Sequence, residues 1–287
     1  MPDYRFITYE SLSNGRVARV YLNRAEYRNA QNFGLLTELD AAFRRAEEDE
    51  QVRVVILGAH GPSFSAGHDL GTPDRKAEMA AMKTGILGTE ERWMRELRYY
   101  FENTRRWRDL QKITIAQVHG NCISAGLMLA WCCDLIVAAE DALFAEVVGT
   151  RLGMCGLEYF AHPWEFGPRK AKELLLTGDS LTAEDAYRLG MVNKVFPTAE
   201  LEASTLRFAE RIAEVPSFAA LLLKESVNQT QDAQGFYTAL KACFSIHEAN
   251  HAHWAEVTKG ASGIGTPEFG VSGERRPIQH AERSTAG

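Results

Sequence analysis

The chain has 287 residues, of which 45% are hydrophobic and 24% are charged, as in an ordinary globular protein. Its formal net charge of −6 and the lack of a basic block argue against nucleic-acid binding. No run of about 18 apolar residues occurs, so we expect no membrane span, and the N-terminus lacks the pattern of a signal peptide. Five cysteines without a C-x-x-C pair indicate a reduced compartment, and we expect a cytoplasmic protein.

Predicted strands and helices alternate along the first two thirds of the chain. Short runs rich in β-branched and apolar residues predict strands over residues 6–12, 17–22, 52–58, 113–118 and 135–138. Apolar residues at helical spacing predict helices over residues 33–43 and 93–110. Residues 71–88 show no period, and we expect a mobile flap over the site there. This order predicts an α/β fold with largely parallel strands.

From Ala199 onward, the residue pattern predicts helices only. We therefore divide the chain near residue 200, into a core over residues 1–199 and a helical region with a tail over residues 200–287. We expect the tail from Gly260 to be ordered only against a partner. An apolar stripe in the helical region predicts contact with other copies of the chain, and it consists of Phe236, Leu240, Phe244 and Trp254.

Two turns of small residues each follow a predicted strand. The first is Phe64-Ser65-Ala66-Gly67-His68-Asp69-Leu70, where Gly67 permits backbone angles that other residues avoid. We expect Asp69 to cap this turn. The second contains Ser124-Ala125-Gly126 and precedes a predicted helix through Trp131. Free amides at the start of a helix suit a developing negative charge.

Together with Cys133-Asp134 and the segment at residues 190–195, these turns resemble those of the crotonase superfamily, also called the enoyl-CoA hydratase/isomerase family. The resemblance implies a spiral of β-β-α units with a C-terminal helical trimerisation region. It implies a homotrimer or a dimer of trimers. The implied substrate is an acyl-CoA thioester, with no cofactor besides this coenzyme A thioester and no metal.

The resemblance also assigns roles to particular residues. The backbone amides of His68 and Ala125 would form an oxyanion hole that stabilises a thioester enolate. Four residues would border the coenzyme A portion of the substrate, namely Arg28, Ala30, Ala66 and Gly67.

The chain departs from the family at the two glutamates that hold and activate water in enoyl-CoA hydratases. Met128 stands at the first position. The second falls on Val148 or Gly149, depending on where a one-residue insertion is placed. A thioether cannot hold a proton at neutral pH, so the sequence predicts weak or absent standard hydration. It leaves open whether the reaction is hydration, isomerisation or another enolate reaction.

Other side chains are candidates for the missing acid and base. Glu146 precedes the second position by two residues, and an extended chain would aim both side chains at one face. Glu158 and His162 are four residues apart and would form an acid/base pair on a shared helix face, although Pro163 disfavours helical geometry at His162. The imidazole of His68 is a further candidate, because histidine titrates near physiological pH.

Two alternative functions stay open. His247-Glu248-Ala249-Asn250-His251 matches the H-E-x-x-H pattern of zinc metallopeptidases, but no clear third ligand follows, although His253 and Glu256 are near. The apolar stripe on the same predicted helix favours a packing role for these histidines. The other alternative is a protein of this fold that binds acyl-CoA with little catalysis.

Overall fold

A six-stranded sheet forms the centre of the molecule. The computed structural model describes residues 4–82 and 85–258, so the predicted tail from Gly260 lies outside the described residues. The strand order is β1-β2-β3-β4-β6-β9, with β1 and β2 antiparallel and the other neighbouring pairs parallel. These strands are β1 (Ile7–Leu12), β2 (Val17–Leu22), β3 (Val54–Ala59), β4 (Ile113–Val118), β6 (Leu135–Ala139) and β9 (Lys194–Phe196).

A second, three-stranded sheet has the order β5-β7-β8. Its strands are β5 (Asn121–Ile123), β7 (Leu143–Ala145) and β8 (Ser180–Thr182). Two isolated bridges connect the first turn to the second, one from Ser63 to Gly120 and one from Ser65 to Cys122. The two turns singled out in the sequence are therefore joined through backbone pairing.

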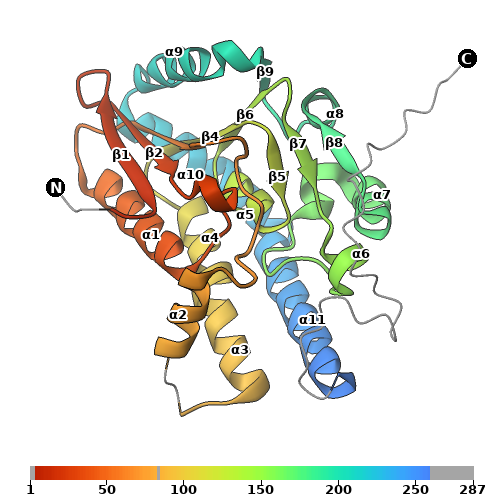
Figure 1. The fold of residues 1–287 in the computed structure, drawn as a ribbon. Helices are drawn as coiled ribbons and strands as arrows, with labels where there is room; N and C mark the ends of the chain where they lie inside the picture. Colours follow the sequence, from red (N-terminus) through yellow and green to blue (C-terminus); the bar gives the residue numbers. More distant parts are fainter. Residues whose placement is uncertain (1–3, 83–84, 259–287) are drawn as a thin grey trace, which may run out of the picture.

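Helices surround both sheets (Figure 1). In the first part of the chain they are α1 (Phe33–Glu48), α2 (Pro73–Ala81), α3 (Gly88–Glu96), α4 (Glu102–Arg108), α5 (Ala125–Trp131), α6 (Val148–Leu152), α7 (His162–Thr177) and α8 (Ala183–Arg188). The later helices are α9 (Leu201–Ala213), α10 (Ser217–Ala233) and α11 (Phe236–Val257). Short turns are η1 (Ala25–Tyr27), the π-helical η2 (Leu97–Phe101) and η3 (Thr198–Glu200).

Both faces of the six-stranded sheet are buried, which explains why its strands are apolar at successive positions. In β3, Val55 and Leu57 join the core that includes α1, whereas Val54 and Ile56 join the core beneath α9. This division follows from the alternation of side chains along a strand. The α/β fold with largely parallel strands is confirmed, and α9 covers one face of the sheet (Figure 1).

The apolar stripe of α11 does not form an exposed surface, so that prediction is wrong. Phe236, Leu240 and Phe244 are buried in the main core of the chain itself. Trp254 packs against Met154, and its indole nitrogen donates to a backbone carbonyl. The stripe is covered within one chain because α11 runs back along the pocket side of the core. None of the described helices is long and apolar enough to cross a membrane.

Helices α2, α3 and α11 extend below the sheets in Figure 1. Helix α2 occupies part of residues 71–88, so the predicted flap contains a helix that the sequence did not indicate. It begins because Thr72 caps it by accepting a hydrogen bond from the Arg75 amide.

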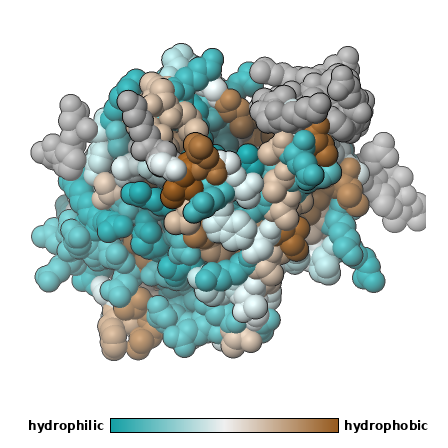
Figure 2. All heavy atoms as spheres, turned by 90° about the horizontal axis from the view of Figure 1, so that it is seen from below, coloured by the Kyte–Doolittle hydropathy of each residue, from teal (hydrophilic) through white to brown (hydrophobic). Residues whose placement is uncertain are grey.

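Helices α3 and α11 pack together through Trp93 and Phe244, whose ring centroids lie 5.2 Å apart. Seen from this end, the surface is mostly hydrophilic, with smaller hydrophobic areas (Figure 2).

Candidate functional site

The two small-residue turns lie directly against each other. The amide of Ser65 donates to the carbonyl of Asn121 at 3.1 Å, and the amide of Ile123 donates to the carbonyl of Ser65 at 2.9 Å. Gly67 has a φ of +89°, and a Cβ there would lie 2.9 Å from the Ile123 carbonyl oxygen and 3.3 Å from the Ala125 nitrogen. Only glycine permits both this backbone angle and this close approach.

The backbone amides of His68 and Ala125 are unpaired at this junction. Neither donates a hydrogen bond to another group in residues 4–82 and 85–258. Ala125 is the first residue of α5, and an amide there has no acceptor within the helix. The residue before it, Ser124, has a φ of 49° and a ψ of −116°, which is strained for a residue other than glycine. Such strain at the exit from β5 is typical of functional sites.

A cavity of about 690 Å³ opens beside the two amides. Of the residues predicted for the site, those that line it are Arg28, Ala66, His68, Ala125 and Glu158. Arg28 and Ala66 are exposed neighbours, because the Ala66 amide donates to the Arg28 carbonyl at 2.9 Å. Ala30 and Gly67 are not among the lining residues, and they lie behind this wall.

Glu158 is buried at the inner part of the cavity, with 2% of its surface exposed. Its Oε1 lies 3.6 Å from Nδ1 of His68 and 3.9 Å from Nε2 of His247. Burial raises the pKa of Glu158 to about 8. Burial lowers the pKa of His68 to about 3, so this imidazole is neutral at pH 7. The His68 ring stacks on Tyr100, with centroids 3.9 Å apart.

Glu146 and His162 lie outside the cavity lining and pair with each other. Oε1 of Glu146 accepts hydrogen bonds from the Ser124 hydroxyl at 3.1 Å and from the Val148 amide at 2.7 Å. Its Oε2 lies 3.7 Å from Nε2 of His162. The chain turns into α6 at Val148, so Glu146 and Val148 do not face one side of an extended strand, and that prediction is wrong.

The predicted helical pair of Glu158 and His162 is also wrong. Glu158 lies in an irregular segment, whereas His162 is the first residue of α7 and is fully buried. Pro163 follows at the start of that helix, where proline is favoured and where it prevents the helix from reaching back to Glu158. The two side chains have different partners, His68 and His247 for Glu158, and Glu146 for His162.

The positions of the missing glutamates carry no acid in the structure. Met128 is 2% exposed and packs in the main core from α5. Val148 lines the cavity with an apolar side chain. A side chain at Gly149 would meet the Leu175 carbonyl oxygen at 3.1 Å, so this position is filled by backbone from α7.

The first turn is held in place by the buried ion pair of Arg24 and Asp69, whose charged atoms lie 3.0 Å apart. Asp69 also accepts hydrogen bonds from the amides of Gly71 and Thr72, at 3.0 and 2.8 Å. Burial alone would raise the pKa of Asp69, but its hydrogen bonds from Thr72, Gly71 and Arg24 hold it below its usual value. The expectation that Asp69 caps the turn is confirmed.

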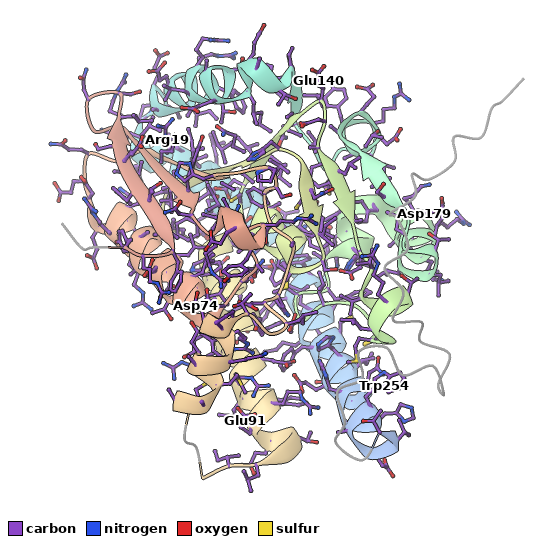
Figure 3. The ribbon with its side chains drawn as sticks, viewed as in Figure 1. Arg19, Asp74, Glu91, Glu140, Asp179 and Trp254 are labelled. Carbon is purple, nitrogen blue, oxygen red and sulfur yellow. The ribbon has the colours of Figure 1, made fainter. Side chains whose placement is uncertain are left out.

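The cavity is also lined by three side chains that the sequence analysis did not group together. They are Glu96 at the end of α3 and His247 and His251 on α11. Their ligand atoms all lie within 4.8 Å of one another. Side chains of α3 and α11 point towards each other between the two helices (Figure 3). About 150 residues of sequence separate Glu96 from the histidines, so no local spacing signals this cluster.

This placement corrects the expectations for the H-E-x-x-H segment. His247 and His251 face the cavity, where the expectation was a packed surface. Glu96 is the third possible ligand beside the two histidines, whereas His253 and Glu256, the candidates from the sequence, are exposed. Glu248, which would be the base of a peptidase, is buried and does not line the cavity. The geometry therefore argues against a metallopeptidase.

Comparison with known proteins agrees with the fold. Residues 13–263 match the family model described as enoyl-CoA hydratase/isomerase. EchA13 of Mycobacterium tuberculosis, named as a candidate enoyl-CoA hydratase, is 60% identical, covering 96% of this chain and 90% of its own. The crotonyl-CoA hydratase of Syntrophomonas wolfei is 32% identical, covering 80% of this chain and 83% of its own.

Solved structures give the same result. A probable enoyl-CoA hydratase from Mycobacterium smegmatis has a TM-score of 0.81 and 47% identity, covering 90% of this chain and 98% of that one. A second, from Mycobacterium thermoresistibile, has a TM-score of 0.82, also with 47% identity, and covers 90% of this chain and 99% of that one. The chain therefore belongs to the enoyl-CoA hydratase/isomerase family and is an enzyme of that kind.

Proposed function

We propose that the chain catalyses a reaction of an acyl-CoA thioester that passes through an enolate. The observation that carries this proposal is the pair of unpaired amides at His68 and Ala125 on the wall of one cavity. A thioester oxygen placed between them would accept two hydrogen bonds as negative charge develops on it. Removing one donor of this kind typically costs about 2.7–4 kcal/mol of barrier.

The coenzyme A portion is proposed to lie along Arg28 and Ala66. Both residues are exposed and line the cavity, and the guanidinium of Arg28 suits a phosphate group. Ala30 and Gly67 would support this segment from behind. No cofactor besides the coenzyme A of the substrate is needed for enolate formation.

Glu158 is proposed to carry the proton to or from the acyl chain. It is buried at the inner part of the cavity that contains both amides, and its carboxyl faces His68. Its raised pKa keeps a proton available near neutral pH, which suits a general acid that can also act as a base. Glu146 and His162 are less suited, because neither lines the cavity.

The reaction is proposed to differ from the standard hydration of the family. That reaction uses two glutamates to hold and deprotonate water, and the corresponding positions here are a core methionine, Met128, and either Val148 or Gly149. An isomerisation or another proton transfer through the enolate requires only the two amides and one proton carrier. The site contains groups suited to those roles.

The test is the exchange of the α-proton of butyryl-CoA for deuterium in D₂O, followed by NMR. We expect the wild-type chain to catalyse exchange, and Glu158→Gln to slow it by about 10²–10⁴-fold, the usual contribution of a general acid or base. Glu146→Gln changes a buried carboxylate that accepts a hydrogen bond from the second turn, and it is expected to slow exchange much less. Binding of butyryl-CoA, measured in parallel, should be nearly unchanged in both variants.

Two outcomes would count against this assignment. Full exchange by Glu158→Gln together with lost exchange by Glu146→Gln would move the proton carrier to Glu146. Tight binding of butyryl-CoA by the wild-type chain without any exchange would favour the alternative of an acyl-CoA-binding protein with little catalysis.

A further inference from the structure

Glu96, His247 and His251 bring three ligand atoms to one point at the cavity wall. The two histidines are four residues apart and share one face of α11. Glu96 reaches them from the end of α3, immediately before the π-helical turn η2. Such single π turns occur often at functional sites because they shift the direction of the side chains around them.

The distances within this triangle fit a tetrahedral metal ion. The Nε2 atoms of His247 and His251 are 3.1 Å apart. Oε2 of Glu96 lies 3.6 Å from the first nitrogen and 3.4 Å from the second. Bonds of about 2.0–2.2 Å to zinc place neighbouring tetrahedral ligands about 3.3–3.5 Å apart. An octahedral ion with bonds of about 2.1 Å would require about 3.0 Å.

Glu96 and His247 also have buried polar atoms that make no hydrogen bond within the described residues. Glu96 is 7% exposed, and its Oε2 makes no hydrogen bond within the described residues. This oxygen faces the two imidazoles at ion-pair distance, and a cation bound between the three groups would compensate its buried charge. His247 is likewise buried, and both of its nearest carboxylates, Glu96 and Glu158, face the same space.

From these observations we propose that Glu96, His247 and His251 bind one divalent transition-metal ion, with zinc as the ion that the distances favour. Two histidines and one glutamate are a known ligand set for catalytic zinc. All three residues line the cavity, so the fourth position of the ion would face the pocket. The inference concerns a binding site and does not depend on the enolate chemistry proposed above.

Glu158 lies beside this site but outside the ligand triangle. Its Oε1 is 3.9 Å from Nε2 of His247, which places it where it would accept a hydrogen bond from a water on the ion. A zinc ion with an open position polarises a carbonyl oxygen or lowers the pKa of its bound water to about 7. The site differs from a peptidase because Glu248 does not line the cavity.

The test is metal binding by the full-length chain without an affinity tag. After dialysis against a chelator, the protein is titrated with Zn²⁺ in competition with a chromophoric chelator, and with Fe²⁺ under anaerobic conditions in a second series. We expect one equivalent of Zn²⁺ to bind, more tightly than Fe²⁺. Glu96→Gln and His251→Ala should weaken zinc binding by at least about 100-fold, since even outer-shell changes typically cost 10–100-fold.

His253→Ala is the matched control, because His253 is an exposed histidine on the same helix. It should bind zinc as the wild-type chain does. X-ray absorption of the zinc-loaded wild type provides a readout that needs no variant to fold, and it should show nitrogen and oxygen ligands only. Absence of stoichiometric binding, sulfur in the ligand shell, or equal affinity in Glu96→Gln, His251→Ala and the wild type would each overturn the proposal. The triangle would then be a hydrogen-bonded histidine pair beside a carboxylate.

Discussion

Burial shifts the pKa values of two titratable side chains that line the cavity, Glu158 and His68. Glu158 keeps its proton near pH 7, because burial raises its pKa to about 8, and His68 stays neutral, because burial lowers its pKa to about 3. The neutral ring stacks on Tyr100 and adds no positive charge to the pocket. The role proposed for the His68 amide depends instead on its backbone position, which Gly67 and the hydrogen bonds of Asp69 determine.

Ala125→Pro tests one of the two proposed amide donors. Proline is tolerated at the first position of a helix, and the change removes only the N–H that is unpaired in this structure. We expect deuterium exchange into butyryl-CoA to fall by about 10²–10³-fold, as for other lost oxyanion donors.

Proline also restricts the residue before it, and Ser124 already has unusual backbone angles, so circular dichroism and thermal unfolding must show a folded variant. Ala125→Ser, which keeps the amide, is the matched control and should retain most of the exchange rate. A folded Ala125→Pro variant with full activity would exclude this amide from the site.

At the scale of helices and strands, the sequence predicted the features that depend on a local residue pattern. The longer strands of the six-stranded sheet and both turns were predictable because β-branched runs and small residues determine local geometry, and the resemblance of the turns pointed to His68 and Ala125. The three-residue strands β5, β7 and β8 were not predicted, because they are too short to show a pattern. Glu158 was predicted as a site residue, but its contacts with His68 and His247 were not, because the irregular segment around Glu158 shows no periodic pattern. Glu96 was missed because only the packing of α3 on α11 brings it to His247 and His251. The buried stripe of α11 was misjudged for the same reason.

Helices α5 and α6 supply no glutamate at the two family positions, so hydration should be weak. For chelator-treated wild-type protein we expect a kcat/KM on crotonyl-CoA well below the range of about 10⁴–10⁸ M⁻¹s⁻¹ that is typical of good enzymes. The physical reason is that no carboxylate at Met128 or Val148 holds and deprotonates the water. A steady-state absorbance assay measures this value. A kcat/KM within that range would show that the chain activates water in another way.

At the scale of the whole molecule, helix α10 carries four exposed apolar side chains close together. They are Phe218, Leu222, Leu223 and Val227, which are 71%, 48%, 64% and 69% exposed. The opposite side of α10 is docked onto the core, because Lys224 is buried and forms an ion pair with Asp134 at 3.0 Å. An outward stripe of this size on a helix that is fixed in place is typical of an interface.

We therefore expect a trimer or a dimer of trimers, with α10 contributing to the contacts between copies. Sedimentation velocity at micromolar concentration should show one of these species. Phe218→Asp combined with Val227→Asp should shift the protein towards monomer, because charges would be buried at the contact. A monomeric wild-type protein would contradict the expectation.

The central claim is that one pocket places a thioester oxygen on the amides of His68 and Ala125 with its α-carbon beside Glu158. A crystal structure of the chain with a bound, unreactive acyl-CoA measures this directly. We predict a thioester oxygen about 2.7–3.1 Å from both amide nitrogens, the hydrogen-bonding range of an oxyanion hole. We also predict that Glu158 is the carboxylate nearest the α-carbon. A thioester oxygen away from either amide, or an α-carbon closer to Glu146 than to Glu158, would contradict the account.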